Sequence, residues 1–410
     1  MKIGKFSSEN NVSIDTIRHY MELGLIIPEK IGGHYDFDEV CKRDLEEIFT
    51  LKSMEFTLNE IKSIFLFKRL GKLTPYQEVE CYRQFFISKC KKIKEQIEEL
   101  HNAKLKLEDE IDRLSSNEDQ ENRTLGVDIS ALSLFKCLMC GKDLTLHEGH
   151  IANNQVINGI LRCKCGNEYT IDDGVLIGKN NIDDYEENLN YNDRKLYIAE
   201  YLNETDLKYL DNIYKGLDWA YKKLNFEELR GKKILDLGSG SGFLLRQIYN
   251  DLPESSLYIA VDHDIERHRF LKAMLEKAEC QKKVIFICSD FLDIPIKDKS
   301  IDMLLDYTGT SNYSFENEEF LLKLIDKLVK DDAFLLGGYI LFAKFSVTSW
   351  INHNYRKNFI LKNVKEELKN LGYIAIDERV SEVLNKGGRF ENYFKEDEKV
   401  YTYGFYGRRY

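Results

Sequence analysis

Hydrophobic positions recur with different spacings in successive parts of the chain. In residues 1–70 they predict short helices, interrupted by Gly and Pro between positions 24 and 33. In residues 76–115 they predict one long helix, which is followed by the polar linker SSNEDQENR. From residue 185 to residue 410, helical patterns alternate with short β-rich runs, as is typical of a parallel α/β sheet. A chain of 410 residues is also long enough for several domains.

The long helix carries apolar residues with a period of seven. The first series is Phe86, Ile93, Leu100, Leu107 and Leu114, and Cys90, Ile97 and Ile111 stand four positions after its members, with Lys104 as the polar exception. A heptad pattern over four repeats predicts a coiled coil, here residues 76–116, and therefore a homodimer. The alternative is a helix packed against its own chain, which rarely keeps a strict period of seven.

Composition and charge limit the other possibilities. The chain has 59 Lys and Arg against 70 Asp and Glu, a formal net charge of -11. Its longest apolar run, AFLLGGYILF, is too short to span a bilayer, and the start MKIGKFSSENN has no signal-peptide core, so we expect a cytoplasmic protein without membrane contact. Nine cysteines, an odd number, favour thiols or a metal site over a disulfide framework.

Residues 12–26, VSIDTIRHYMELGLI, predict a helix that begins after Ser13. Ser13 stands where an N-cap side chain accepts a hydrogen bond from the free N–H groups of the next turn. Arg18 and His19 project from this helix.

Residues 1–70 resemble the MerR family of transcription regulators. The resemblance lies in IGKFSSENNVSIDTIRHYMELGLI, GGHYDFDEV and LEEIFTLKSMEFTLNEIKSIF. It implies a winged helix-turn-helix domain, residues 1–75, that binds double-stranded DNA and dimerises through the helix that follows. The implied DNA-contacting residues are Ser13, Thr16, Arg18, His19 and Tyr20.

The wing departs from the family pattern, because His34-Tyr35 stands where the family has Tyr-Arg. The segment also holds ten Lys or Arg against twelve Asp or Glu, whereas DNA-binding domains are usually basic. A winged helix used for protein contact is therefore the alternative.

Two cysteine pairs lie within residues 131–180. Cys137 and Cys140 form a C-x-x-C pair, Cys163 and Cys165 form a C-x-C pair, and each pair precedes a glycine. Four thiolates from two such knuckles can hold one tetrahedral Zn²⁺ in a closed, structural site. The alternative is ordinary buried thiols. His147 and His150 lie between the pairs and could be ligands, although four thiolates already complete the site. The segment, with its tail YTIDDGV, resembles the small zinc ribbon associated with tRNA and rRNA methyltransferases.

The stretch KKILDLGSGSGFLLRQI predicts a buried strand, a glycine-rich turn and a helix. Such a turn lets the backbone approach a ligand in front of a helix N-terminus. Gly238, Gly240 and Gly242 are spaced G-x-G-x-G, and Phe243 stands where a dinucleotide-binding fold has its third glycine. With Asp236 before them, the glycines match the S-adenosylmethionine (SAM) motif of class I methyltransferases.

Later strands supply the other features of that family in order. In SLYIAVDHD the strand ends in Asp262, which the resemblance implies accepts hydrogen bonds from the ribose hydroxyls of SAM, and His263 follows it. KVIFICSDFLDIP ends near Asp290 and Phe291, for adenine, and SIDMLLDYTG contains Asp306 at its end. With helix 315–330, strand 333–342, helix 356–371 and two final strands, the pattern predicts a seven-stranded α/β methyltransferase domain. We place it at residues 185–410, with residues 185–228, including Trp219, as an N-terminal helical lid. An α/β domain that binds no SAM is the alternative.

The methyl acceptor is less well defined. The D/N-P-P-Y and Pro-Cys motifs of nucleic-acid methyltransferases are missing after the fourth strand, where the chain reads DYTGTSNYS. Tyr307, Thr310 and Tyr313 could line an acceptor pocket or could be packing residues; no catalytic residue is identified. We therefore expect a MerR-like regulator fused through a zinc ribbon to a methyltransferase that acts on a small molecule. The alternatives are a ligand sensor that transfers no methyl group, and a nucleic-acid methyltransferase.

Overall fold

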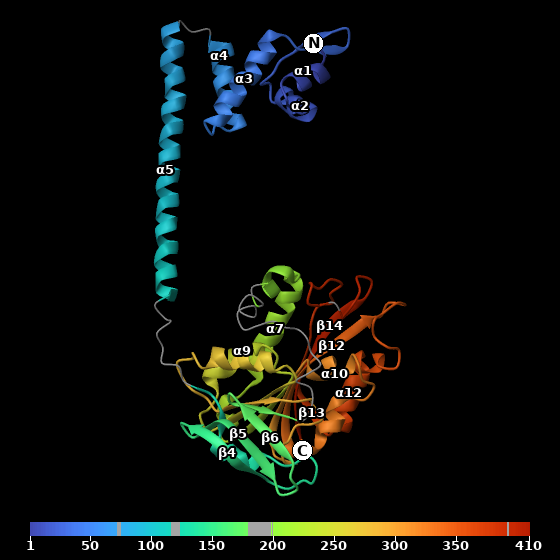
Figure 1. Cartoon of the computed structure of the whole chain (residues 1–410). Helices are drawn as coiled ribbons and strands as arrows, with labels where there is room; N and C mark the ends of the chain where they lie inside the picture. Colours follow the sequence, from blue (N-terminus) through green and yellow to red (C-terminus); the bar gives the residue numbers. More distant parts are fainter. Residues whose placement is uncertain (72–74, 116–123, 179–197, 199, 392) are drawn as a thin grey trace. The chain divides into compact units, whose positions relative to one another are not determined.

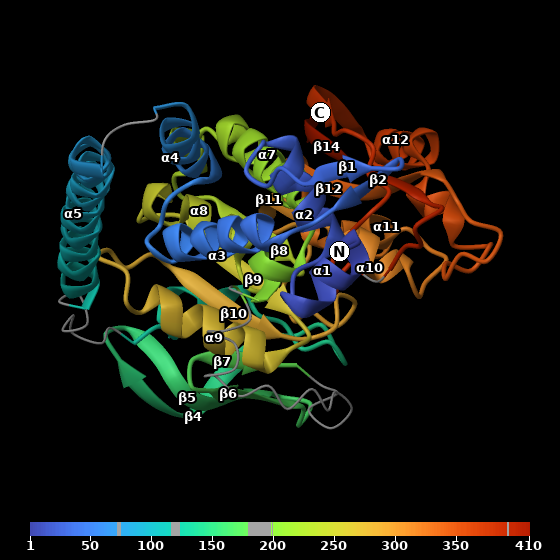
Figure 2. The same cartoon turned by 90° about the horizontal axis from the view of Figure 1, so that it is seen from above.

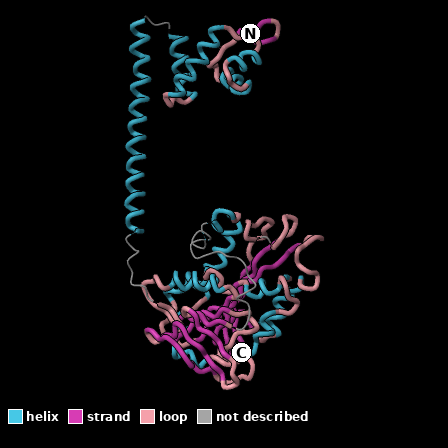
Figure 3. Tube along the Cα trace, viewed as in Figure 1, coloured by secondary structure: helices cyan, strands magenta, loops and turns pink. Residues whose placement is uncertain are grey.

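A computed structural model of the chain describes residues 1–71, 75–115, 124–178, 198, 200–391 and 393–410 (Figure 1). It divides into two compact units, Met1–Asp119 and Gln120–Tyr410. Within the described ranges, no helix is both long enough and apolar enough to cross a membrane. The first unit is mainly helical and the second contains one large sheet, which confirms the multidomain fold class (Figure 3).

The first unit begins with a helix-turn-helix and a short hairpin. Its elements are α1 (Ile3–Glu9), α2 (Ile14–Glu22), β1 (Glu29–Ile31), β2 (His34–Asp36), α3 (Glu39–Ser53), α4 (Leu58–Gly71) and α5 (Pro75–Ser115). The expected cap is present, since the Ser13 side chain accepts a hydrogen bond from the Thr16 N–H at 3.1 Å. Phe6, Ile17 and Leu25 are fully buried and hold α1 and α2 against α3 and α4.

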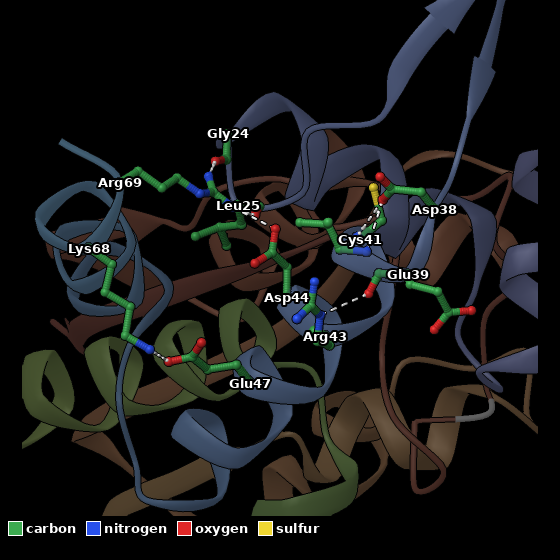
Figure 4. A network of polar contacts seen from close by, with 11 residues as sticks. Gly24, Leu25, Asp38, Glu39, Cys41, Arg43, Asp44, Glu47, Lys68 and Arg69 are labelled. Carbon is green, nitrogen blue, oxygen red and sulfur yellow. Dashed lines mark hydrogen bonds and ion pairs between the residues drawn. The ribbon is translucent and has the colours of Figure 1, made fainter. Parts of the chain in front are cut away.

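A polar network fastens α4 to the turn after α2 (Figure 4). Gly24 has a φ of +72°, which ends the helix and leaves backbone carbonyls without helical partners. The Arg69 guanidinium donates to the Gly24 carbonyl at 2.7 Å and to the Leu25 carbonyl at 2.6 Å, and it also pairs with Asp44 at 2.7 Å. Arg69 of α4 therefore supplies hydrogen bonds to the backbone carbonyls that follow the end of α2.

Helix α5 starts as part of this core and then leaves it. Tyr82, Phe85 and Phe86 pack against the buried cluster, and Lys89 and Lys92 both pair with Glu60 of α4. Phe86, expected in the coiled-coil seam, thus contacts Phe56 within its own chain, at a centroid distance of 5.4 Å. Farther along, the predicted seam is open to solvent: the exposed fractions are 61% for Ile97, 70% for Leu100, 66% for Leu107 and 60% for Ile111.

The second unit contains the seven expected strands. They are β8 (Lys233–Leu237), β9 (Leu257–Asp262), β10 (Val284–Cys288), β11 (Ile301–Tyr307), β12 (Val329–Lys344), β13 (Tyr373–Val380) and β14 (Lys399–Arg409). Their order in the sheet is β13-β14-β12-β11-β8-β9-β10. All are parallel except β14, which runs antiparallel to both β12 and β13. The central strands are buried on both faces, because helices cover both sides.

The helices of this unit partly differ from the expected ranges. They are α7 (Leu207–Lys223), η3 (Phe226–Leu229), α8 (Phe243–Ile248), η4 (Tyr249–Asp251), α9 (Ile265–Leu275), α10 (Gly309–Ser314), α11 (Leu321–Ile325), η5 (Asp326–Leu328), η6 (Arg356–Phe359) and α12 (Leu361–Asn370). The helix expected at 315–330 is shorter, and that at 356–371 is divided. Of the expected lid, residues 185–197 lie outside the described residues, and α7 is its main helix.

The cysteine-bearing segment continues the same sheet. Its elements are β3 (Val127–Asp128), η2 (Ile129–Leu134), β4 (Leu144–Ala152), β5 (Gln155–Cys163), β6 (Glu168–Asp172) and β7 (Val175–Ile177). Strand β7 pairs in parallel with β10, and β6, β5 and β4 follow outward (Figure 2). The sequence predicts a separate ribbon, whereas in the described residues the cysteine-bearing strands and the seven strands above form one sheet of 12 strands. The pairing of β7 with β10 leaves Val175 and Leu176 fully buried.

Candidate functional site

A cavity of about 770 Å³ opens at the carboxyl ends of β8, β9, β10 and β11. In open α/β sheets, ligands bind at this edge, where the loops after neighbouring strands meet. The glycine-rich loop lines the cavity with Gly238, Ser239, Gly240 and Ser241. Of the residues expected to bind a cofactor, Asp236, Asp262, His263, Asp290 and Phe291 also line it.

The three glycines of the loop have different surroundings, although each has a positive φ. A Cβ on Gly240 would meet no atom closer than the Gly238 carbonyl oxygen, 3.8 Å away, so this position leaves room for a ligand. A Cβ on Gly242 would lie 2.3 Å from Leu271 Cδ1. Gly242 does not line the cavity, contrary to expectation; it permits α8 to pack closely against α9.

Asp236 is a buried carboxyl group in the cavity wall. The Tyr258 hydroxyl donates a hydrogen bond to its Oδ2 at 2.7 Å. Burial raises the pKa of Asp236 to about 7, and the hydrogen bond from Tyr258 opposes that shift, while Asp262 adds to it. A buried acid of this kind ionises more readily when a positively charged ligand lies beside it.

Asp262 connects the end of β9 to the glycine-rich loop. Its Oδ2 accepts a hydrogen bond from the Gly240 N–H at 2.8 Å, and its Oδ1 accepts one from the Asp264 N–H at 3.0 Å. The Nδ1 atom of the half-exposed His263 is 3.6 Å from Oδ1. Each carboxylate oxygen can accept a further hydrogen bond from a ligand hydroxyl.

Asp290 follows β10, Asp306 lies near the end of β11, and the two carboxyl groups have different surroundings. Asp290 is exposed at the cavity, where its Oδ1 accepts from the Leu292 N–H at 2.9 Å. Asp306 is fully buried, does not line the cavity, and accepts from the Thr310 N–H at 2.7 Å. Burial raises the pKa of Asp306 to about 6. The expectation that Asp306 contacts the cofactor is therefore wrong for its side chain, which instead holds the start of α10.

The cavity extends beyond the glycine-rich loop to α7, β13 and β14. Tyr307 and Tyr313 line this part, whereas Thr310 is buried outside it. The sequence identified Trp219 only as part of the lid. It gave no sign of the lining residues Tyr209, Asn212, Arg379, Ser381, Phe390, Tyr393, Tyr401 and Tyr403. These come from segments far apart in the chain, so only the folded sheet brings them together.

The four cysteines meet at the outer end of the extended sheet. Their Sγ atoms all lie within 4.8 Å of one another, with Cys137 and Cys165 3.6 Å apart and Cys140 and Cys163 3.4 Å apart. Desolvation raises the pKa of Cys137, but hydrogen bonds from the backbone N–H groups of Cys140 and Met139 outweigh it and lower the pKa to about 6. The four sulfur atoms are suitable metal ligands, and they lie close enough together to bind one metal ion.

The expected DNA-binding residues lie on α2 and its cap. Ser13, Thr16, Arg18 and His19 belong to the surface of the helix, and Arg18 pairs with Asp15 at 3.1 Å. Tyr20 is only 2% exposed and packs in the core of the first unit. The structure therefore corrects the placement of Tyr20 at the DNA surface, because its ring supports α2 from beneath.

Comparison with protein families identifies two regions. Residues 1–67 match the family model of the MerR HTH family regulatory proteins. Residues 228–401 match the model of a methyltransferase domain. One curated relative, an HTH-type transcriptional regulator ZntR homolog of Haemophilus influenzae, is 27% identical over 127 residues, which are 30% of this chain and 91% of the relative.

Solved structures were compared with the chain as well. A SAM-dependent methyltransferase from Aquifex aeolicus is 19% identical and covers 47% of this chain and 89% of its own, with a TM-score of 0.33. The phosphoethanolamine N-methyltransferase 2 of Haemonchus contortus, in complex with S-adenosyl-L-methionine, is 15% identical and covers 48% of this chain and 52% of its own, with a TM-score of 0.34. The assignment of the two regions rests on the family models and not on these distant structures.

Proposed function

We propose that this chain, which joins a MerR-type regulator domain to a methyltransferase domain, methylates a small molecule with SAM and binds double-stranded DNA as a homodimer. The observation that carries the first part is the cavity at the carboxyl ends of the parallel strands, with its open glycine-rich loop and its carboxyl groups. When bound there, SAM would supply an electrophilic methyl group on a positively charged sulfur.

The lining residues fit such a cofactor by their chemistry. Asp262 can accept hydrogen bonds from ribose hydroxyls while it holds the Gly240 N–H. The Phe291 ring and the neighbouring Asp290 can contact adenine. Asp236, with its pKa raised to about 7, can ionise beside a cationic group and stabilise it. Gly238 and Gly240 allow the backbone to approach the ligand closely.

A small acceptor agrees with the shape of the cavity. Residues of α7, among them Tyr209, line the cavity together with Tyr393, and the hydroxyls of these two tyrosines are 2.5 Å apart. Exclusion of water and alignment of the acceptor are what displacement at a sulfonium methyl group chiefly requires. A duplex would also meet the carboxyl groups at the rim, Asp290, Asp293 and Glu316, which disfavour phosphate.

The dimer and its DNA contact are supported by two surfaces. The exposed apolar side chains on α5 form one face of the helix that the described residues of its own unit do not cover, and a second copy of the helix would bury them. On α2, Ser13, Thr16, Arg18 and His19 are available to a duplex. Two such helices in one dimer would bind two half-sites of a palindrome cooperatively.

The cysteine cluster is proposed as a structural Zn²⁺ site. Four thiols complete a tetrahedral shell and leave no open position for catalysis. The metal would hold the ends of β4, β5 and β6 together. Strand β7 pairs with both β6 and β10, so it connects these strands to the rest of the sheet.

A second function, ligand sensing without methyl transfer, is favoured by one observation. Burial raises the pKa values of Tyr209, Tyr307 and Tyr393, so these phenols stay neutral and are poor general bases. A domain that bound SAM or its product without turnover could still change the DNA affinity of the dimer.

A labelling experiment separates the two functions. The full-length protein and its Gly240→Val variant are each incubated with methyl-labelled SAM and a small-molecule extract of cells. Label that enters the extract only with the unchanged protein supports methyl transfer. SAM binding by calorimetry without any incorporation supports the sensor, and the absence of both binding and incorporation contradicts both functions.

A further inference from the structure

The part of the cavity away from the glycine-rich loop has an unusual combination of charge and aromatic surface. Arg379, near the end of β13, and Ser381, just after that strand, both line the cavity. Trp219 and Tyr307 line it from α7 and from the end of β11. Of the Asp, Glu and Arg side chains that line the cavity, six are acidic, and four of these lie at or after β8, β9 and β10. Arg379 belongs instead to β13, at the other end of the order of the seven strands.

The carboxylates nearest to Arg379 in sequence are engaged elsewhere. Asp377 pairs with Lys223, and Glu378 pairs with Lys365 at 2.7 Å and accepts from the Tyr403 hydroxyl at 2.5 Å. The other arginine of the wall, Arg267, pairs with Asp264 at 3.2 Å. Among the residues that the structure describes, no carboxylate forms an ion pair with Arg379. A half-buried guanidinium with unused donors is suited to an anionic ligand group.

Three glycines give the aromatic rings their positions. A Cβ on Gly338 would lie 2.9 Å from the Tyr307 ring, and a Cβ on Gly404 would lie 2.8 Å from the Trp219 ring. A Cβ on Gly216 would lie 2.4 Å from the Tyr307 hydroxyl and 3.6 Å from Arg379 Nη1. The Tyr307 hydroxyl and the Arg379 guanidinium therefore both lie beside Gly216 of α7, where both could donate to one ligand group.

We infer that the methyl acceptor is an aromatic carboxylate, whose acid group is bound by Arg379 and the Tyr307 hydroxyl and whose ring lies against Trp219. The inference rests on the proposed function. Arg379 offers the two parallel N–H donors that match a carboxylate. The Tyr307 hydroxyl remains protonated because burial raises its pKa, although the charge of Arg379 opposes the shift, and it therefore acts as a donor.

The arrangement orients the acceptor for transfer. With its carboxylate at β13, the ring points a hydroxyl or amino substituent toward the side of the glycine-rich loop. A lone pair on that oxygen or nitrogen forms the bond to the methyl carbon while the sulfur–carbon bond breaks. The bonding pair returns to sulfur, and the proton of the acceptor group leaves to water. Anion binding far from the reacting atom also holds the acceptor in place without lowering the nucleophilicity of that atom.

Trp219 provides a direct measurement. The chain has two tryptophans, and the second, Trp350, is 72% exposed and lies outside the cavity wall. In the full-length Trp350→Phe protein, fluorescence therefore reports on Trp219 alone. The protein is saturated with S-adenosylhomocysteine, which calorimetry monitors separately. It is then titrated with 4-hydroxybenzoate, 4-hydroxybenzamide, 4-hydroxybenzylamine and phenyl phosphate.

We expect 4-hydroxybenzoate to quench Trp219 and to bind at least about tenfold more tightly than the amide or the amine, because a charge-assisted pair is lost with each. Arg379→Gln should remove that preference, Arg379→Lys should keep part of it, and Arg389→Gln, at an exposed arginine outside the cavity wall, should leave it unchanged. Equal binding of acid and amide, or an unchanged preference in Arg379→Gln, overturns the inference. Tighter binding of phenyl phosphate overturns the carboxylate assignment. Failure of S-adenosylhomocysteine to bind overturns the proposed function instead.

Discussion

Replacement of Asp262 by Ala removes a carboxylate of the cavity wall that accepts two backbone hydrogen bonds. Its Oδ2 accepts the Gly240 N–H at 2.8 Å and its Oδ1 accepts the Asp264 N–H at 3.0 Å, and the side chain is 4% exposed. The substitution would leave both N–H groups without this acceptor and would remove the proposed partner of the ribose hydroxyls. We therefore expect a loss of ligand affinity that combines a missing contact with a less ordered loop.

The magnitude follows from the contacts. Loss of a charged acceptor in a desolvated site costs about 2–3 kcal/mol, which corresponds to a dissociation constant about 30- to 150-fold higher. Asp262→Asn offers one acceptor oxygen but turns an NH₂ group toward one of the two backbone N–H groups. It should therefore also weaken binding, by about tenfold or more. Asp331→Asn, at a side chain that is 89% exposed, is the matched control and should bind as the unchanged protein does.

The assay is a calorimetric titration of the full-length protein with SAM and with S-adenosylhomocysteine, accompanied by thermal unfolding of each variant. Unfolding shows whether a variant has kept its fold, so that a loss of affinity can be assigned to the site. If folded Asp262→Ala binds either ligand within threefold of the unchanged protein, the carboxylate is not the ribose acceptor and the reasoning is refuted.

Four further predictions concern other parts of the molecule. Gly242→Ala should lower the melting temperature more than Gly240→Ala, because its Cβ adds a clash with Leu271 to the strain of a positive φ; equal melting temperatures would contradict this. Leu100→Asp should convert a dimer to a monomer in sedimentation, and a monomeric unchanged protein would exclude the coiled coil. Cys137→Ser should release about one zinc per chain in elemental analysis, a result that unchanged zinc content would refute. The pKa of Asp236 is raised to about 7, so in the protein without ligand the contribution of this group to stability is lost as the pH rises toward 7. SAM should bind more tightly at pH 8 than at pH 6, because the ionised carboxylate stabilises its positive charge. Asp236→Asn should flatten the pH dependence of SAM binding in calorimetry and that of stability in thermal unfolding.

The sequence predicts the sheet well and its extension poorly. Buried parallel strands such as Val284–Cys288 appear in the sequence as continuous apolar runs. Their arrangement in the sheet then follows from their order in the chain, because crossover connections are right-handed. Strand β7 has only three residues, Val175–Ile177, and its partner lies more than a hundred positions away. No local pattern indicates that pairing, so the continuity between the cysteine segment and the methyltransferase sheet emerges only from the fold.

In the candidate site, too, the local sequence predicts some features, whereas others depend on segments that are far apart in the chain. Asp262, Asp290 and Asp306 all lie at or just after a strand, but only Asp306 turns to a buried N–H, that of Thr310. That difference depends on the conformation after β11, where Thr308 has a φ of +74°. Arg379 stands in an ordinary alternating strand, and its place in the cavity wall, beside Gly216 of α7, depends on segments that are far apart in the chain.

The charge of the first unit bears on how it could bind DNA. Many of its basic side chains are used within the fold: Arg69 pairs with Asp44, Lys68 pairs with Glu47, and Lys89 and Lys92 pair with Glu60. Arg69 and Lys68 fasten α4 to α3, and the pairs of Lys89 and Lys92 with Glu60 fasten the start of α5 to α4. Cations that are paired in this way contribute little to a phosphate-binding surface. A single copy would therefore bind a duplex weakly, through the few polar side chains of α2 and its cap. Because the same ion pairs fix the start of α5 on the helix-turn-helix, a coiled coil of two such helices would set the separation of two recognition helices. Specific binding would then depend on dimerisation more than on the charge of either copy.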